Sequence, residues 1–290
     1  MNIKESRWLP PLPFFFGSPV LLWQLFFFYL PLLLLTLSSI LTFSPLGNFE
    51  GLTLDRLLLF LQPVYAKVIL SSLLLALSNA LICFFIGYPI AYFLAFKAKK
   101  MKPLFLFFLI VPFWINFLLH VYAWFFVLEK EGFLNWLLLS LGIMDQPIPF
   151  LNSLFAILLM MVYYYLPFMI LPLYSSLEQF NIQLIEASQD LGAKGWQTLL
   201  YILLPLSKGG IMAGFFLVFI PSFGEFAIPE LMGGDKWLFV GNVVSQYILS
   251  ETEGALGAAF TLVSALALLL AALLLYKGLN FLLKPKGEHA

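Results

Sequence analysis

Hydrophobic residues run along this chain in long stretches without charge. The charge-free intervals cover residues 8–49, 68–96, 103–128, 146–177, 209–224 and 254–276. About 20 apolar residues cross the hydrocarbon core of a bilayer as a helix, which satisfies its own backbone hydrogen bonds. The pattern therefore predicts an all-α, polytopic membrane protein with six transmembrane helices in a single domain, residues 1–290. The spans are expected at about 21–43, 68–96, 103–128, 150–175, 205–231 and 254–283.

Prolines and charges refine two of these spans. Several prolines before residue 20 indicate an irregular approach to the first span. Its charge-free run is too long for a secretory signal and has no cleavage-site pattern, so we expect it to be retained. The fifth helix is expected to begin near Pro205, to continue past Glu225 and to be broken locally near Gly224. Residues 57–66 are too few to span and are predicted to be interfacial.

Composition and charge support a membrane protein and set its orientation. Hydrophobic residues make up 62% of the chain and charged residues 10%, against about a quarter in soluble domains. The formal net charge is zero, so no global field favours nucleic acid. With both termini cytoplasmic, 11 of the 15 basic residues fall inside, including those of the KAKKMK turn at residues 97–102. The positive-inside rule favours this orientation.

The longest predicted inside loop contains the most specific motif. Residues 178–205, here called the signature loop, have apolar positions at helical spacing up to Leu191, and Gly192 then suggests a helix end. Glu186, Ala187 and Ser188 are followed after three residues by Gly192, and after nine more by Ile202, Leu204 and Pro205. This loop resembles that of the membrane subunits of ATP-binding-cassette importers, which reads Glu-Ala-Ala, three residues, Gly, nine residues, Ile-x-Leu-Pro. Ser188 is the one departure from that pattern.

The resemblance implies that the signature loop docks on a cytoplasmic ATPase and couples its closure to the membrane helices. The residues that it assigns to coupling are Glu186, Ala187, Ser188, Asp190, Gly192, Ile202 and Pro205. The chain has no G-x-x-x-x-G-K-[ST] motif. We therefore expect no catalytic residue and no bound cofactor in this chain, with ATP and Mg used by the partner ATPase.

Further segments resemble the B-type membrane subunit of spermidine/putrescine importers, the type I importer permeases of polyamines. They are GYPIAYFLAF at 87–96, LIVPFWIN at 109–116, LPFMILPLYSSLE at 166–178, DLGAKGWQT at 190–198 and ELMGG at 230–234. The resemblance implies a bacterial inner-membrane complex with a second homologous permease, two ATPase copies and an extracytoplasmic polyamine-binding protein. Related permeases carry cations, iron, sulfate or sugars, so another solute remains an alternative.

Acidic and aromatic side chains are candidates for a cation pathway. Glu225 is predicted within the outer leaflet, where a carboxylate should face the bundle interior or water, and Glu230 lies nearer the boundary. Trp114, Tyr122 and Trp124 are the aromatic candidates for cation–π contacts. For Glu225 the alternatives are a packing hydrogen bond or a position outside the membrane. Aromatic residues near span ends are more often interfacial anchors.

Four other residues have a structural and a functional interpretation. His120 is expected to be a hydrogen-bonded core histidine more readily than a proton relay, and with only His289 besides, no metal site is predicted. Cys83 is expected to be a small buried residue. Gly210 and Gly214 predict close helix packing, either within the chain or against the second permease.

Two function classes compete with the importer. A secondary transporter or channel would have coupling acids deep in several spans and often two matching halves. A non-transporting membrane assembly protein would need no ATPase-docking loop. The signature loop argues against both.

Overall fold

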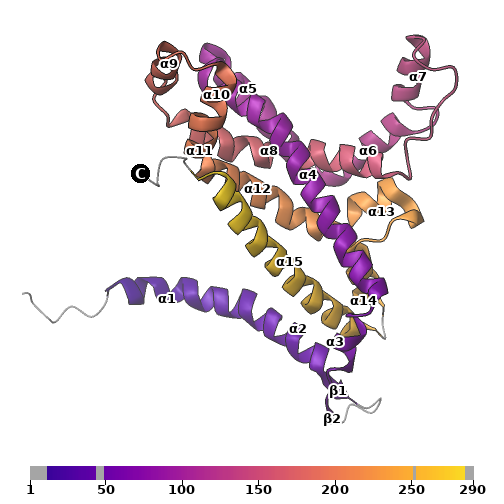
Figure 1. Cartoon of the computed structure of the whole chain (residues 1–290). Helices are drawn as coiled ribbons and strands as arrows, with labels where there is room; N and C mark the ends of the chain where they lie inside the picture. The colour runs from indigo at the N-terminus through magenta and orange to yellow at the C-terminus, as the bar shows by residue number, and fades with distance from the viewer. Residues whose placement is uncertain (1–11, 44–48, 251–252, 285–290) are drawn as a thin grey trace, which may run out of the picture. The chain divides into compact units, whose positions relative to one another are not determined.

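The computed structural model describes residues 12–43, 49–250 and 253–284. Its contacts divide the chain into two compact units, residues 1–62 with 246–263, and residues 63–245 with 264–290. Apart from one short hairpin the described elements are helices (Figure 1). The all-α membrane fold predicted from the sequence is confirmed.

The first unit combines a long apolar helix with a small hairpin. α1 (Leu12–Gln24), a π-helical turn (Leu25–Tyr29) and α2 (Leu30–Ile40) follow one another directly. The helix ends at Ile40, before the predicted residue 43, because β1 (Leu41–Phe43) pairs antiparallel with β2 (Phe49–Leu52). Arg56, in α3 (Asp55–Leu59), donates to the Leu41 carbonyl at 2.8 Å and closes the hairpin against α2.

The second unit is built around three helices that pack against one another, α4 (Pro63–Phe96), α8 (Leu154–Glu178) and α12 (Lys208–Phe223) (Figure 1). α4 begins upstream of the predicted residue 68, because a proline at the first helical position lacks only an N–H that would have no partner. The other helices are α5 (Lys102–Ile110), α6 (Phe117–Leu128), α7 (Phe133–Ser140), α9 (Gln183–Asp190), α10 (Gly195–Thr198), α11 (Leu204–Leu206), α13 (Ala227–Gly233), α14 (Val240–Leu249) and α15 (Gly254–Leu282). Helical turns lie at Lys99–Met101, Val111–Trp114, Leu199–Leu203 and Gly234–Lys236.

The helix predicted over 103–128 is not straight. It stops at Trp114, and the segments Lys99–Trp114 and Phe117–Ser140 meet at 97°. Ile115 is extended, and the Asn116 side chain accepts from Leu118 N at 2.8 Å, which starts α6. The hydrophobicity of residues 103–128 predicts one span. The turn Val111–Trp114, which contains Pro112, and the helix cap Asn116 that follows it divide this span into two helices.

The helix predicted over 205–231 is divided twice. The segments Gly195–Leu206 and Lys208–Phe223 meet at 74° at Ser207, so α12 begins after Pro205. α12 then ends at Phe223 with Gly224 as its C-cap, and Glu225 lies between α12 and α13. The local break expected near Gly224 is present, whereas a continuous helix past Glu225 is not.

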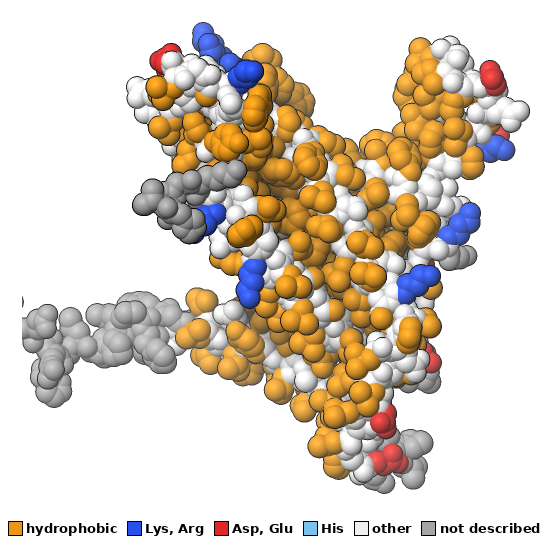
Figure 2. All heavy atoms as spheres, viewed as in Figure 1, with side chains coloured by type: hydrophobic (Ala, Val, Ile, Leu, Met, Phe, Trp, Pro, Cys, Tyr) orange, Lys and Arg blue, Asp and Glu red, His pale blue; other side chains and the backbone are white. Residues whose placement is uncertain are grey.

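Four helices in the described residues are long and apolar enough to cross a membrane, or up to six if each bent pair counts as one span. They are Ser18–Ile40, Pro63–Phe96, Leu154–Glu178 and Gly254–Leu282. The space-filling view shows hydrophobic side chains over most of the visible surface, with charged side chains in small groups (Figure 2). This distribution is what a bilayer requires of the lipid-facing residues.

Candidate functional site

The signature loop forms a short helix with two different faces. In α9, Ile185 and Ser188 are buried one turn apart. Leu184, Ala187 and Leu191 lie at the spacing i, i+3, i+7 on an exposed face, and Leu191 is 90% exposed. These three residues are called the outer ridge. Glu186 and Asp190 are also exposed, so the ridge has acidic neighbours.

Gly192 makes the turn that follows α9. Its φ is +83°, a region that residues with a Cβ rarely adopt. Its N–H donates to the Gln189 carbonyl at 2.8 Å, and Ala193 N–H donates to the Ser188 carbonyl at 3.0 Å. This pair of bonds terminates α9 and directs the chain into α10, as expected of the glycine in the motif.

A buried hydroxyl pair joins the two arms of the loop. Ser188 Oγ donates to the Ile185 carbonyl at 2.7 Å and lies 2.9 Å from Thr198 Oγ1. Because Ser188 has one hydroxyl hydrogen, Thr198 is the donor in the second bond. The departure from alanine at position 188 thus has a structural consequence, which is to fasten α9 to α10.

The end of the loop is connected to the three-helix core. Ile202 lies in the π-helical turn and Pro205 in α11, both partly buried. Ser207, at the bend into α12, donates to the Leu203 carbonyl at 2.6 Å and lies 3.2 Å from the Tyr88 hydroxyl of α4. A displacement of the loop would therefore act on α4 and α12 through Ser207.

The signature loop and the KAKKMK turn lie at the same end of the second unit. Lys102 Nζ is 2.7 Å from Glu178 Oε1 and 5.5 Å from the ring centroid of Tyr174. This pair joins the start of α5 to the end of α8, where the signature loop begins.

Glu225 is half-buried, and both of its carboxylate oxygens accept hydrogen bonds. Its Oε2 accepts from the Tyr165 hydroxyl at 2.9 Å, and its Oε1 accepts from Ala227 N and Ile228 N at 3.1 and 3.4 Å. The carboxylate therefore caps α13 and joins it to α8. The packing hydrogen bond considered from the sequence is present, and the negative charge lies beside an aromatic region of α8.

Glu230 is exposed and is held by α14. Its Oε2 accepts from Asn242 Nδ2 at 2.6 Å, while the same amide also contacts the Phe226 carbonyl at 3.3 Å. Glu230 is therefore bonded to α14 and Glu225 to α8, so the two predicted acids have different neighbours.

The three aromatic candidates do not meet Glu225. Trp114 is 75% exposed and touches Phe107, and Tyr122 is exposed as well. Trp124 packs edge-on against Tyr163, with ring centroids 5.4 Å apart. The ring bonded to Glu225 is instead that of Tyr165 in α8, with Tyr164 packed against it, and the sequence signal for both was the run of three tyrosines at 163–165.

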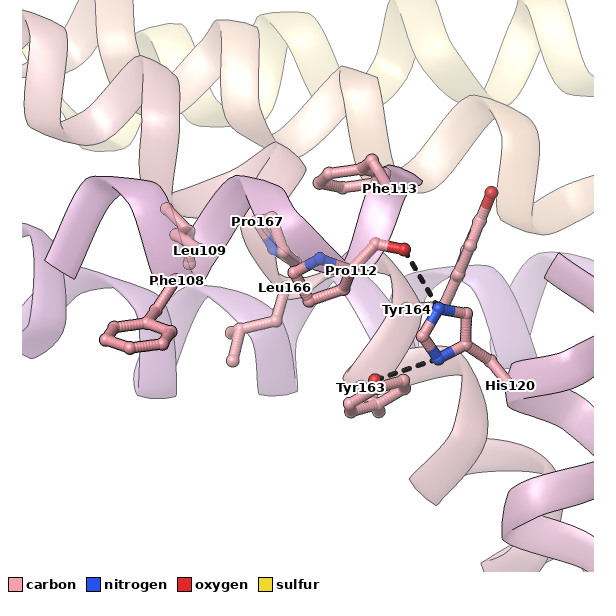
Figure 3. A pocket seen from close by; sticks show the side chains of 9 residues that line it. All are labelled: Phe108, Leu109, Pro112, Phe113, His120, Tyr163, Tyr164, Leu166 and Pro167. Atoms are coloured by element: carbon pink, nitrogen blue, oxygen red, sulfur yellow. Dashed lines mark hydrogen bonds between the residues drawn. The ribbon is translucent and has the colours of Figure 1, made fainter. Parts of the chain in front are cut away.

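His120 is 9% exposed and has both ring nitrogens bonded (Figure 3). Nε2 is 2.9 Å from the Pro112 carbonyl and Nδ1 is 3.0 Å from the Tyr163 hydroxyl. A carbonyl can only accept, so Nε2 carries the proton and Nδ1 accepts from Tyr163. His120 therefore joins both arms of the 97° bend to α8, at the edge of an apolar cavity of about 170 Å³.

Replacing His120 by leucine should destabilise the protein, because it leaves the Pro112 carbonyl and the Tyr163 hydroxyl without these bonds. An unsatisfied buried group costs about 1–3 kcal/mol, and because Pro112 and Tyr163 are only partly buried the cost here should lie at the lower end of that range. Tyr163→Phe removes only the second bond and should cost less. Thermal unfolding of the purified protein in detergent measures both, and equal melting temperatures for His120→Leu and the unsubstituted chain would contradict this role.

Gly210 and Gly214 pack within the chain, against α8. A Cβ at Gly210 would lie 2.5 Å from Ser176 Cβ and 2.7 Å from the Pro172 carbonyl oxygen. One at Gly214 would lie 3.0 Å from the Met169 carbonyl oxygen. Of the two packing alternatives considered from the sequence, the structure has the intrachain one.

The core also holds a polar pair that the sequence did not single out. Asn79 Nδ2 donates to Ser222 Oγ at 2.8 Å between α4 and α12, and Cys83 Sγ lies 3.6 Å from Asn79 Oδ1. All three residues are buried. In the part of the chain that the structure describes, no three His, Cys, Asp or Glu side chains cluster as a metal site requires.

Comparison with known proteins agrees with this arrangement. The chain is 41% identical over 269 residues to the spermidine/putrescine transport system permease protein PotB of Escherichia coli (strain K12), covering 92% of this chain and 97% of that protein. Identity to the protein of the same name from Haemophilus influenzae (strain ATCC 51907 / DSM 11121 / KW20 / Rd) is 38% over 269 residues, covering 92% and 93%.

Solved structures share the fold. A bacterial ABC transporter involved in the import of the acidic polysaccharide alginate has a chain that superposes with a TM-score of 0.70 at 17% identity, covering 92% of this chain and 94% of that one. Residues 84–286, well over half of the chain, match the family described as binding-protein-dependent transport system inner membrane component. The chain, with its signature loop fastened to a three-helix core, belongs to that family.

Proposed function

We propose that this chain is a permease subunit of an ATP-binding-cassette importer and forms part of the pathway for polyamines such as spermidine and putrescine. The observation that carries the importer assignment is the signature loop, whose outer ridge is exposed at one end of the core. The polyamine assignment is supported by the relatives, which are named as spermidine/putrescine permeases at about 40% identity over nearly the whole chain.

The outer ridge is suited to docking in a groove of a cytoplasmic ATPase. Helix-in-groove recognition uses apolar residues at i, i+3 and i+7, the spacing of Leu184, Ala187 and Leu191. Exposed Glu186 and Asp190 add carboxylates for a basic or backbone partner. Because Ser207 joins the loop to α4 and α12, ATPase closure would move these helices as a rigid body. This chain supplies no hydrolysis, and ATP and Mg belong to the ATPase.

The complete importer would contain a second homologous permease, two ATPase copies and an extracytoplasmic polyamine-binding protein in the bacterial inner membrane. The proposed orientation puts both termini in the cytoplasm. The Lys102–Glu178 pair supports it, since the lysine-rich turn and the signature loop occupy the same end.

Uptake of labelled spermidine into proteoliposomes tests the proposal. The vesicles hold this chain, its partner permease and the ATPase, with loaded binding protein outside and ATP inside. ATP-dependent uptake is the expected result. ATP turnover with uptake of another solute but not spermidine would overturn the cargo, and failure of any ATPase to co-purify would overturn the importer assignment.

Replacing Glu186 by alanine should lower ATPase retention and uptake together, because one exposed carboxylate beside the outer ridge is lost. An exposed charged contact at an interface contributes about 1 kcal/mol, which corresponds to roughly fivefold in affinity. Glu131→Ala makes the same charge change in an exposed turn outside the loop and is the control. Co-purification of the ATPase at graded salt measures the difference, and equal retention in both variants would remove Glu186 from the docking surface.

A further inference from the structure

A cavity between α8 and α12 has walls that are mostly aromatic. It has a volume of about 450 Å³, within the range of small-ligand sites. Tyr164, Tyr165 and Phe168 line it from α8, and Phe216 and Leu217 from α12. The α8 rings lie against one another, with centroids 5.3 Å apart for Tyr164–Tyr165 and 6.2 Å for Tyr165–Phe168.

A carboxylate is hydrogen-bonded to one residue of this aromatic wall, although Glu225 itself does not line the cavity. Tyr165 lines the cavity with its ring and donates its hydroxyl to Glu225 Oε2. Glu225 is held from the other side by two backbone N–H groups, so its position is fixed before any ligand arrives. Among the described residues, no Lys or Arg forms an ion pair with Glu225. The hydrogen bonds orient its negative charge without cancelling it.

We propose that this cavity binds an alkylammonium group of the cargo, with Tyr164, Tyr165, Phe168 and Phe216 around the cation and Glu225 as its counter-charge. The site rests on the proposed function and names the place where this chain recognises its substrate. Trp114, Tyr122 and Trp124 do not line this cavity, and their place in the pathway stays a prediction.

The chemistry of the walls favours an organic cation over other ligands. A metal ion or an inorganic cation needs several oxygen ligands, whereas the lining is almost entirely carbon. An amine with methylene groups can bury its chain against Leu217 while its ammonium lies over aromatic rings. An anion would be repelled by the Glu225 carboxylate and by the negative faces of the aromatic rings. A neutral apolar chain would fill the same space but would gain nothing from Glu225.

A cysteine placed in the cavity reports occupancy without requiring transport. Leu217 is 49% exposed and lines the cavity, and the native Cys83 is buried, so Leu217→Cys gives this chain one accessible thiol, whose labelling is read on the separated subunit. In the assembled complex, spermidine should slow maleimide labelling of this thiol. An uncharged diol of similar length, at the same concentration, should not.

Removing the charge or a ring should weaken this protection. Glu225→Gln keeps the shape and an acceptor for α13, and should raise the spermidine concentration for half-protection by about tenfold or more. Phe168→Leu should raise it by about threefold to tenfold. Glu131→Gln removes the same charge in an exposed turn between α6 and α7 and is the matched control, with no change expected.

The outcomes separate this site from the proposed function. If unsubstituted complex imports spermidine with ATP but spermidine does not protect Leu217→Cys, the site is wrong and the importer assignment stands. If the diol slows labelling as much as spermidine does, the cavity is an apolar space without cation recognition. The same holds if spermidine protects the thiol equally well when Glu225 is replaced by glutamine. If spermidine is neither imported nor protective, the cargo and the site both fail.

Discussion

Replacing Gly210 by alanine is expected to separate α12 from α8 and to reduce the amount of folded protein in the membrane. The added Cβ would meet the Pro172 carbonyl oxygen at 2.7 Å and Ser176 Cβ at 2.5 Å. Backbone cannot move aside as a side chain can, so one methyl group forces the helices apart. Overpacking of this kind costs about 1–3 kcal/mol. Because proteins are only marginally stable, a substantial loss of folded material follows.

Gly209→Ala is the matched control, since a Cβ there meets nothing within 4 Å. Both substitutions improve intrinsic helix propensity equally, so any difference between them reports packing alone. Detergent-solubilised yield by size-exclusion chromatography and the melting temperature are the measurements. If Gly210→Ala matches Gly209→Ala in both, the close contact between α12 and α8 is not as the structure has it.

Replacing Gly192 by valine is expected to lower transport by about tenfold while membrane insertion is retained. Gly192 has a φ of +83°, and an L-residue with a Cβ pays about 1–2 kcal/mol in the left-handed region, with a β-branched residue at the upper end. The turn would relax to another conformation and redirect the outer ridge relative to α10. Every 1.4 kcal/mol lost from the docked geometry is tenfold in ATPase affinity.

Gly195→Val serves as the control for this position, because Gly195 has an ordinary backbone conformation and free space around it. The loop is outside the three-helix core, so both variants should insert and purify equally. Uptake and ATPase co-purification in the same vesicles measure the effect. Normal uptake by Gly192→Val would show that the turn tolerates another conformation and that coupling does not depend on it.

The limits of sequence reasoning are clearest at the two bent helices. Hydrophobicity alone presents residues 103–128 as one span, since the stretch is mostly apolar and holds no Asp, Glu, Lys or Arg. Whether the chain continues straight past Pro112 depends on the Asn116 cap and on His120, which bonds the Pro112 carbonyl across the bend. Proline in a transmembrane helix is tolerated or not according to what satisfies the freed backbone groups, and those partners come from elsewhere in the fold.

The candidate site shows the same division. That Glu225 is an unusual charge near the membrane could be read from its place in an apolar stretch. Which aromatic residue bonds it could not, because Tyr165 and Glu225 are far apart in the sequence and meet only when α8 packs against α12 and α13. Trp114 and Tyr122 are equally able to make cation–π contacts, but they are exposed side chains elsewhere in the structure.

The sequence by itself determined the all-helical membrane fold, the signature loop with its Gly192 turn, and the family, because hydrophobic length, glycine conformation and fixed motif spacing are local properties of the chain. Tertiary structure alone decided where the third and fifth helices bend, that Gly210 contacts α8, and which rings lie beside Glu225. These features depend on distances between residues far apart in the chain, and such distances exist only once the helices have packed.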